Sequence, residues 1–354
     1  MPHPWKPPEM RDVLPHIRAW RQQGRRIAVA TLVQVWGSAP RRTGARVVVS
    51  DATELAGSVS GGCVESAVLQ EAVEVFQTGR ALTLAYGVSD EDAWAVGLTC
   101  GGAIELLVEE IPAAGVDPVW DTVLDRVESE ALFGMATLLT GHRAGARLVL
   151  SPGGDRTGSL GDAVLDDAAV RFLSGKFPTP GGWRQQVTGQ DGELFLEVQG
   201  PRKKLVIFGG VHIAIPLVKM AKDLGWRTVV VDPRTAFATR ERFPDADRLL
   251  TDWPHKALAE LEVDAGTAIA VLSHDPKIDI PAVQGALASP AFYVGALGSR
   301  KTHKKRVETL KQAGLPQEAI DRIHAPIGLD LGGREPEEIA LAVLAQIVEI
   351  RSKN

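Results

Sequence analysis

The stretch "LVIFGGVHIAIPLVKMAKDLGWRTVVVDPRTAF", residues 205–237, decides the fold class of the second part of the chain. A short apolar run precedes a glycine pair, a segment with apolar residues at helical spacing, and a second apolar run that ends in Asp232. This order is typical of the first unit of a doubly wound parallel sheet. Two later apolar runs, "TAIAVLSHD" and "AFYVGALGS", alternate with helical stretches. We therefore expect a Rossmann-like domain over 201–354, closed by a helix at 335–351.

The glycine turn departs from the dinucleotide-binding fingerprint G-x-G-x-x-G, whose middle glycine lets the backbone approach the pyrophosphate. Counted from Gly209, the chain has Val211 at the middle position and Ala214 at the last. Because valine would fill the space of a phosphate, we expect weak or absent binding of NAD(P). A Rossmann-like domain without a nucleotide is an equally good interpretation.

A nucleotide-like site is nevertheless outlined by residues that follow the predicted strands. Asp232 lies about 20 residues after the turn, where a ribose-binding acid belongs. "VLSHDP" places a histidine at the carboxyl end of a strand, where the alternatives are that it titrates, coordinates a metal or caps a turn. "GSRKTHKKR" fits either an anion site or a solvated basic helix start. The residues of this candidate site are Gly209, Gly210, His212, Asp232, Arg234, His274, Asp275, Gly298 and Ser299.

The first part of the chain contains an internal repeat. "GARVVVSDATELAGSV" at 44–59 aligns without gaps with "GARLVLSPGGDRTGSL" at 145–160, and "ATL" precedes each copy. A duplicated strand–strand–helix–strand unit packs naturally as one two-fold-related domain. We therefore expect one α+β domain over 1–200, with halves of about 25–110 and 131–200. The predicted elements are helices at 9–23 and 64–78 and strands at 27–36, 45–50 and 101–111.

The two halves differ at one loop. Where the first reads "SGGCVES", the second reads "GDAVLDD", and the first also has an extra loop, "WGSAPRRT". The chain has only two cysteines, Cys63 and Cys100, and a glycine pair adjoins each. Near a helix start, unpaired N–H groups stabilise a thiolate or bind an anion, and glycines admit a ligand to the main chain. The alternative is that both cysteines are small core residues beside glycine turns.

Composition excludes several classes of protein. The chain has 354 residues and a formal net charge of −5, which argues against nucleic acid as a partner. It has no apolar run long enough to span a bilayer, and its first residues lack the apolar region of a secretory signal. Two cysteines are too few for an all-cysteine zinc site or an iron–sulfur cluster and indicate a reducing compartment. We expect a cytoplasmic protein that does not associate with membranes.

Eight motifs, in order along nearly the whole chain, resemble the XdhC/CoxI family: "GSAPRRTGARVVVS", "GSVSGGCVE", "GLTCGG", the "VHIA" start of the Rossmann-like part, "VVVDPR", "LSHDP", "YVGALGSRKTHKKR" and "HAPIGLDLGGREPEEIALAVLAQI". The resemblance implies an XdhC domain followed by a Rossmann domain, in a homodimer. Where related sequences read G-x-G-H, this chain has Val211 before His212.

The resemblance also implies a function. Members of this family are accessory proteins for molybdenum hydroxylases such as xanthine dehydrogenase. They bind molybdenum cofactor, protect it while a terminal sulfur is installed, and deliver it to the apoenzyme; a cysteine desulfurase is an expected second partner. The alternatives are a nucleotide-dependent oxidoreductase or sulfur-transfer enzyme with a reactive cysteine, and a purely structural assembly protein.

The residues expected to bind the cofactor come from the three glycine-containing motifs of the first half. Glycine-rich loops and arginines suit the pterin phosphate. A soft thiolate, Cys63 or Cys100, suits a molybdenum or sulfur centre, and either is the candidate metal ligand. The expected site is Ser38, Arg41, Arg46, Gly61, Gly62, Cys63, Glu65, Cys100, Gly101 and Gly102.

Overall fold

The computed structural model describes residues 10–39, 41–62, 64–87, 102–187 and 192–353. The chain divides into two compact units between Pro201 and Arg202, and each unit is described by itself. Among the described residues, none of the helices has the length and apolar character needed to cross a membrane.

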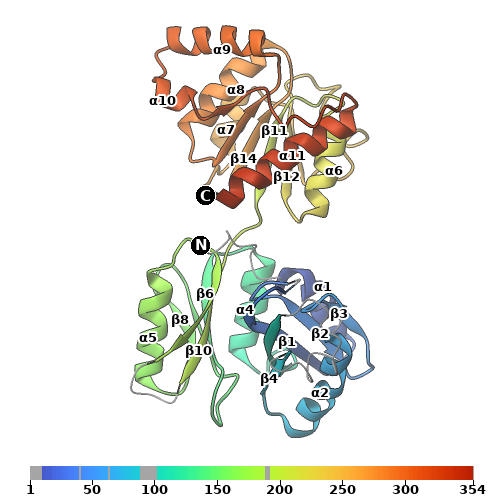
Figure 1. The fold of residues 1–354 in the computed structure, drawn as a ribbon, viewed down its shortest axis with the longest axis vertical. Coiled ribbons are helices and arrows are strands. Elements are labelled where there is room, and N and C mark those ends of the chain that lie inside the picture. The colour runs from blue at the N-terminus through green and yellow to red at the C-terminus, as the bar shows by residue number, and fades with distance from the viewer. Residues whose placement is uncertain (1–9, 40, 63, 88–101, 188–191, 354) are drawn as a thin grey trace. The chain divides into compact units, whose positions relative to one another are not determined.

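The first unit contains two five-stranded antiparallel sheets with the same strand order (Figure 1). The first sheet has the order β3-β2-β1-β5-β4, with β1 (Ile27–Trp36), β2 (Arg46–Ser50), β3 (Leu55–Gly57), β4 (Leu82–Tyr86) and β5 (Ala103–Ile111). The second has the order β8-β7-β6-β10-β9, with β6 (Phe133–Leu138), β7 (Arg147–Leu150), β8 (Arg156–Gly158), β9 (Gly181–Gln186) and β10 (Glu193–Gln199). The internal duplication predicted from the sequence is confirmed.

Helices cover both faces of each sheet. α1 (Met10–Gln22) and α4 (Pro118–Glu128) pack on each other, and one apolar cluster joins them to strands of both sheets. α2 (Glu65–Thr78) and α5 (Ala163–Ser174) cover the other face of the first and second sheet respectively. Within the described residues, each half therefore has the order helix, three strands, helix, two strands. The structural repeat begins one helix earlier than the repeat visible in the sequence.

Local sequence explains where these helices begin and end. α4 starts at Pro118, and its N-cap Asp117 accepts hydrogen bonds from the N–H groups of Val119 and Trp120. α2 ends at Gly79, which takes the left-handed conformation with φ of 66°. The predicted helices and strands of the first half agree with the observed ones to within two residues.

Two buried ion pairs join the halves. Arg46 of β2 lies 2.5 Å from Glu197 of β10, and Arg147 of β7 binds Glu109 of β5. The four side chains are at most 7% exposed. The arginines are 101 positions apart, at the same place in the two copies of the repeat. Each half therefore supplies the counterion for the arginine of the other half.

The second unit is a six-stranded parallel sheet of order β13-β12-β11-β14-β15-β16, the strand order of a Rossmann fold. Its strands are β11 (Lys204–Phe208), β12 (Arg227–Val231), β13 (Arg248–Leu250), β14 (Thr267–Val271), β15 (Tyr293–Ala296) and β16 (Ile323–His324). The predicted doubly wound parallel sheet is confirmed.

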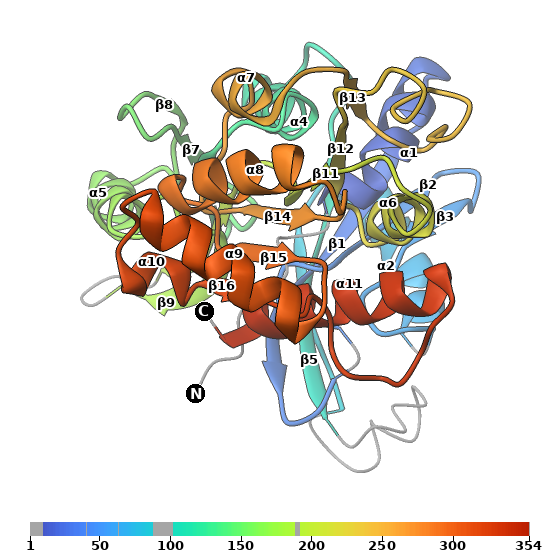
Figure 2. The ribbon, with the colours of Figure 1, turned by 90° about the horizontal axis from the view of Figure 1, so that it is seen from above.

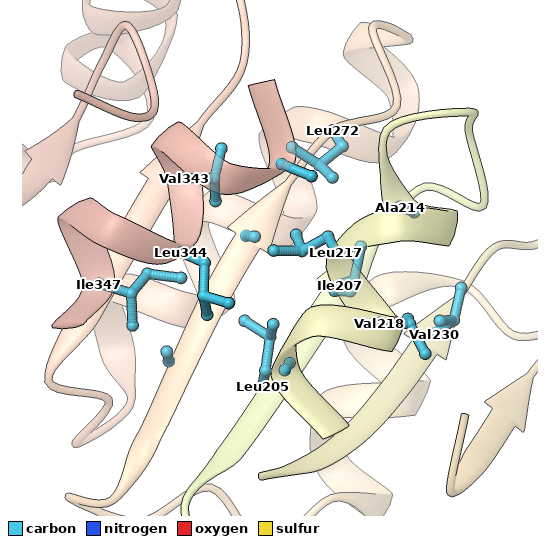
Figure 3. Close-up of a cluster of buried hydrophobic side chains, with 14 of the residues drawn as sticks. Leu205, Ile207, Ala214, Leu217, Val218, Val230, Leu272, Val343, Leu344 and Ile347 are labelled. Carbon is cyan, nitrogen blue, oxygen red and sulfur yellow. The ribbon is translucent and has the colours of Figure 1, made fainter. Parts of the chain in front are cut away.

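Two apolar clusters, one on each face, hold helices to this sheet. On one face, α6 (Ala214–Asp223) and α11 (Pro336–Lys353) pack over Leu205 and Ile207 (Figure 3). The other face carries the remaining helices (Figure 2), which are α7 (Pro254–Glu260), α8 (Pro276–Ala288), α9 (Arg300–Gln312) and α10 (Gln317–Ile320). The carboxyl ends of the strands are left to carry the connecting loops.

Candidate functional site

The three motif-bearing segments of the first half leave the first sheet at the same end. In the antiparallel register, Trp36 at the end of β1 pairs with Ala103 at the start of β5. Val47, near the start of β2, pairs with Gly57 at the end of β3. One end of the strands therefore carries the loops 37–45 and 58–64 and the residue before β5, and we call this end the edge of the first sheet.

Two of the predicted site residues meet at this edge through their main chains. A Cβ atom added to Gly102 would lie 2.1 Å from the carbonyl oxygen of Ser38 and 2.9 Å from that of Trp36. Only glycine fits such an approach, so Gly102 fixes the start of the 37–45 loop. Gly102 is buried, whereas Ser38 is exposed.

Glu65 holds the 58–64 loop together by hydrogen bonds. Its side chain is buried at the start of α2. Its carboxylate accepts hydrogen bonds from the hydroxyl groups of Ser58 and Ser60 and from the N–H groups of Val59, Ser60, Gly62 and Val64. One carboxylate thus joins the donors of the loop to Val64, the N-cap residue of α2.

These hydrogen bonds keep Glu65 charged. Burial by itself would raise the pKa of this carboxyl, but the hydrogen bonds from Ser60 and Ser58 outweigh burial and lower the pKa to about 2. The loop therefore contains a permanent, buried negative charge at neutral pH.

The equivalent loop of the second half is built differently. Asp166, at the position of Glu65, accepts hydrogen bonds from the hydroxyl of Ser159 and the N–H of Leu160, both at 2.7 Å. A second acid, Asp162, caps α5 through the N–H groups of Val164 and Leu165. In the aligned numbering α5 starts three residues earlier than α2. The first half lacks both the cap residue and the first turn of the helix that the second half has.

Gly61 and Gly62 occupy the places of that cap and first residue. Their φ angles are +83° and +119°, which a residue with a side chain adopts only with strain. We expected their N–H groups to receive an anion from the ligand. Instead, the N–H of Gly61 donates to the Ser58 hydroxyl and that of Gly62 to the Glu65 carboxylate, each at 2.9 Å. The carboxylate of the protein itself fills the expected anion site.

The predicted arginines are divided between two environments. Arg46, which we expected to bind a phosphate, is 2% exposed and paired with Glu197, and it also donates to the carbonyl of Gly44. Its role in this structure is therefore to join the two halves. Arg41 is partly exposed within the 37–45 loop. Three further predicted residues, Cys63, Cys100 and Gly101, lie outside the described residues.

In the second unit the glycine turn lies at the carboxyl edge of the sheet, between β11 and β14. A Cβ atom on Gly209 would lie 2.7 Å from Cα of Ser273, so this turn contacts the loop after β14. Gly210 donates its N–H to Asp232 at 2.9 Å. The structure thus brings together the glycine turn, the loop after β14 and Asp232, as predicted for a Rossmann crevice.

Both carboxylate oxygens of Asp232 are already hydrogen-bonded within the protein. Asp232 is fully buried, and Arg234 binds one oxygen through Nε at 2.8 Å and the other through Nη2 at 2.7 Å. The guanidinium of Arg234 also stacks on Phe237, 3.8 Å from the ring centre. Burial alone would raise the pKa of Asp232, but the bonds from Arg234 and Gly210 lower it. Asp232 therefore stabilises the turn rather than presenting a group to a ribose.

The other predicted residues of this unit have local structural roles or are exposed. Asp275 is the N-cap of α8, and Ser299 is the N-cap of α9. His212 and His274 are exposed, and His274 has a positive φ of 63°. Within the described part of the chain, no group of three or more His, Cys, Asp or Glu side chains is arranged to hold a metal ion.

Sequence reasoning missed two features near these sites. Trp36, at the end of β1, is 45% exposed beside the Ser38–Gly102 contact; the signal for it was its place in the extra loop of the first half. In the Rossmann unit, Ser273 donates to the buried Asp279 at 2.6 Å, and Arg306 lies 3.5 Å from the same carboxylate. The pairing of Arg306 with Asp279 joins α9 to α8, and no local motif predicts it.

Residues 20–87 match the model of the XdhC and CoxI family, and residues 205–347 match that of the XdhC Rossmann domain. The chain belongs to the XdhC and CoxI family. The first matched segment contains the loops 37–45 and 58–64, and the second contains the glycine turn and Asp232.

Two similar proteins cover almost the whole chain. One, from Bacillus subtilis, is described as a probable subunit of xanthine dehydrogenase and is 28% identical over 328 residues, or 92% of this chain and 93% of the relative. The molybdenum cofactor insertion chaperone PaoD of Escherichia coli is 29% identical over 329 residues, or 93% of this chain and 84% of PaoD. A crystal structure from Bacillus halodurans, described as a xanthine dehydrogenase, has a TM-score of 0.78 at 24% identity and covers 96% of both chains. This last likeness supports the fold.

Proposed function

We propose that this chain binds molybdenum cofactor as cargo, protects it during sulfuration, and delivers it to a molybdenum hydroxylase of the xanthine dehydrogenase type. The observation that carries the proposal is the asymmetry of the duplicated unit. The half matched by the XdhC and CoxI family has an uncapped, glycine-containing helix start, whereas the other half keeps a capped one. The name of the relative PaoD supports the same role.

The residues assigned to the cargo are those at the edge of the first sheet. The loop at 37–45 would contact the pterin and its phosphate, with Arg41 supplying positive charge. The loop at 58–64 would contact the reactive end through Cys63, whose thiolate is a soft ligand for molybdenum or sulfur. Cys100 and the adjoining glycines complete the proposed site.

The structure supports a carrier over a nucleotide-dependent oxidoreductase. In the Rossmann unit, Asp232 is held by Arg234 and Gly210, so it is not available for a ribose hydroxyl. The proposed partners are the apoenzyme, a cysteine desulfurase and a second copy of this chain.

The test is retention of the cofactor. Purified protein mixed with molybdenum cofactor should elute with it from a gel-filtration column, and the pterin should be seen by fluorescence after oxidation. Cys63→Ala should weaken retention, with Cys100→Ala measured in parallel. Elution of the wild-type protein without pterin would contradict the proposed function, and full retention by Cys63→Ala would remove the role of that thiol.

A further inference from the structure

The two halves of the first unit differ in how side chains bond the start of the helix that follows the third strand. In the second half two acids share the work, because Asp162 caps α5 and Asp166 holds the preceding loop. In the first half Glu65 holds the loop and also accepts the N–H of Val64, the N-cap residue of α2, and no side chain caps the helix. Glu65, one methylene longer than Asp166, receives N–H groups from the loop and from the helix start.

We propose that Glu65 is the positioning residue of the cofactor-binding loop: its carboxylate ties the loop to the N-cap residue Val64 and thereby keeps Gly61 and Gly62 out of the helix. This inference rests on the proposed function.

The hydrogen bonds hold the loop against the start of α2, although no side chain caps this helix. Without an N-cap, the N–H groups at the start of a helix lack partners. Oε2 of Glu65 lies 2.9 Å from the N of Gly62 and 3.2 Å from that of Val64. The hydroxyl of Ser60 adds a bond to Val64 at 2.8 Å. Since these bonds hold Gly62 and Val64 from within the loop, glycine can stand where the second half has Asp162.

The consequence is a stretch of bare, exposed main chain. Gly61 and Gly62 are both exposed. Within the described part of the chain, and apart from Gly62 and its two chain neighbours, no heavy atom lies within 4 Å of the place where a Cβ on Gly62 would be. A ligand can therefore approach the backbone here. Because the glycine N–H groups are already bonded, the surface offers no anion site, and the phosphate of the pterin must bind elsewhere, as assigned to the 37–45 loop.

The test transfers the residues of the helix start in the second half to the equivalent positions of the first half. The triple variant Gly61→Asp, Gly62→Ala and Glu65→Asp gives the first half the cap, first helical residue and acid of the second half, and it leaves Cys63 in place. Because the transplanted residues form a complete cap, we expect a melting temperature within about 5 °C of wild type. Retention of molybdenum cofactor on gel filtration should fall about tenfold or more, since the bare main chain is lost.

Two further variants distinguish the positioning of the 58–64 loop by Glu65 from a general effect on the stability of the protein. Glu65→Gln should lose retention, whereas the matched change Asp166→Asn in the other half should leave retention unchanged even if it lowers the melting temperature equally. A triple variant that is folded and retains the cofactor like wild type would overturn the inference. So would equal loss of retention in Glu65→Gln and Asp166→Asn at equal melting temperature.

A readout without the cofactor keeps the inference testable if the proposed function fails. In a Cys100→Ser background, the rate of labelling of Cys63 by a thiol reagent at one fixed pH reports the conformation of the loop. We expect the triple variant to change this rate at least about threefold, because the residue is moved into a capped helix. A rate unchanged in the folded variant would overturn the positioning role. Absence of cofactor from wild-type protein contradicts only the proposed function.

Discussion

The guanidinium of Arg46 lies 2.5 Å from the carboxylate of Glu197, and this buried contact binds the first half of the duplicated unit to the second. The repeat forms the contact twice, since Arg147 binds Glu109 in the opposite direction. A charge buried without its partner is far more costly than a pair. The two halves are therefore expected to fold as one body.

Glu197→Ala should be strongly destabilising, because it leaves Arg46 buried without a counterion. We expect a loss of about 3–5 kcal/mol in the free energy of unfolding, measured by urea denaturation. The control is Asp167→Ala, which removes the exposed pair with Arg156 and should cost less than about 0.5 kcal/mol. A loss below about 1 kcal/mol for Glu197→Ala would show that the pair does not hold the halves together.

Gly102→Ala should displace the 37–45 loop, because its Cβ atom would collide with the carbonyl oxygen of Ser38. We expect about 1–3 kcal/mol of destabilisation and reduced retention of molybdenum cofactor. Gly153→Ala is the matched control, since the nearest atom to its added Cβ is 3.9 Å away. Equal stability and equal retention in the two variants would contradict the assigned role of the Ser38–Gly102 contact.

The low pKa of Glu65 predicts a particular dependence of stability on pH. Its pKa is about 2 in the folded protein and about 4.3 in an unfolded chain, so its stabilisation is present above pH 4.3 and is lost as pH falls toward 2. Glu65→Gln should therefore cost about 2–3 kcal/mol at pH 7 and clearly less at pH 3. Glu74→Gln, on the exposed side of the same helix, is the control. A cost for Glu65→Gln that is independent of pH would contradict this prediction.

Binding of NAD(P) should be weak or absent in a calorimetric titration, because Val211 departs from the fingerprint and Asp232 is engaged by Arg234. Val211→Gly restores the middle glycine and is the matched variant. If it gains affinity, the valine is the obstacle; if it does not, the engaged Asp232 is the better explanation. Tight binding by the wild-type chain, with a dissociation constant below about 10 µM, would refute the prediction.

The sequence predicts well those features that depend on local chemistry. Gly57 and Gly158 recur in the aligned repeat, and in the structure both have a positive φ and pack against the carbonyl of an equivalent arginine. A run of three valines likewise predicted β2, and the order of apolar runs predicted the parallel sheet. Such signals lie within a few residues of the element that they specify.

The sequence predicts poorly which partner a charged residue takes. Arg46 was assigned to a ligand because it follows two other arginines, yet it binds a glutamate 151 positions away. Asp232 was placed correctly at the end of its strand, but its contacts are with the protein itself. In both cases the residue type was informative, and the long-range contact that decides its role is set by the fold.

Joining the two copies in one chain has a consequence for how this protein can change. In a dimer of identical chains, a mutation that opened the helix start would appear in both copies and weaken both. Here the two loops are encoded separately, so the loop at 58–64 can diverge while the loop at 159–162 keeps its aspartate cap. The capped helix start of one copy therefore does not constrain the sequence of the other.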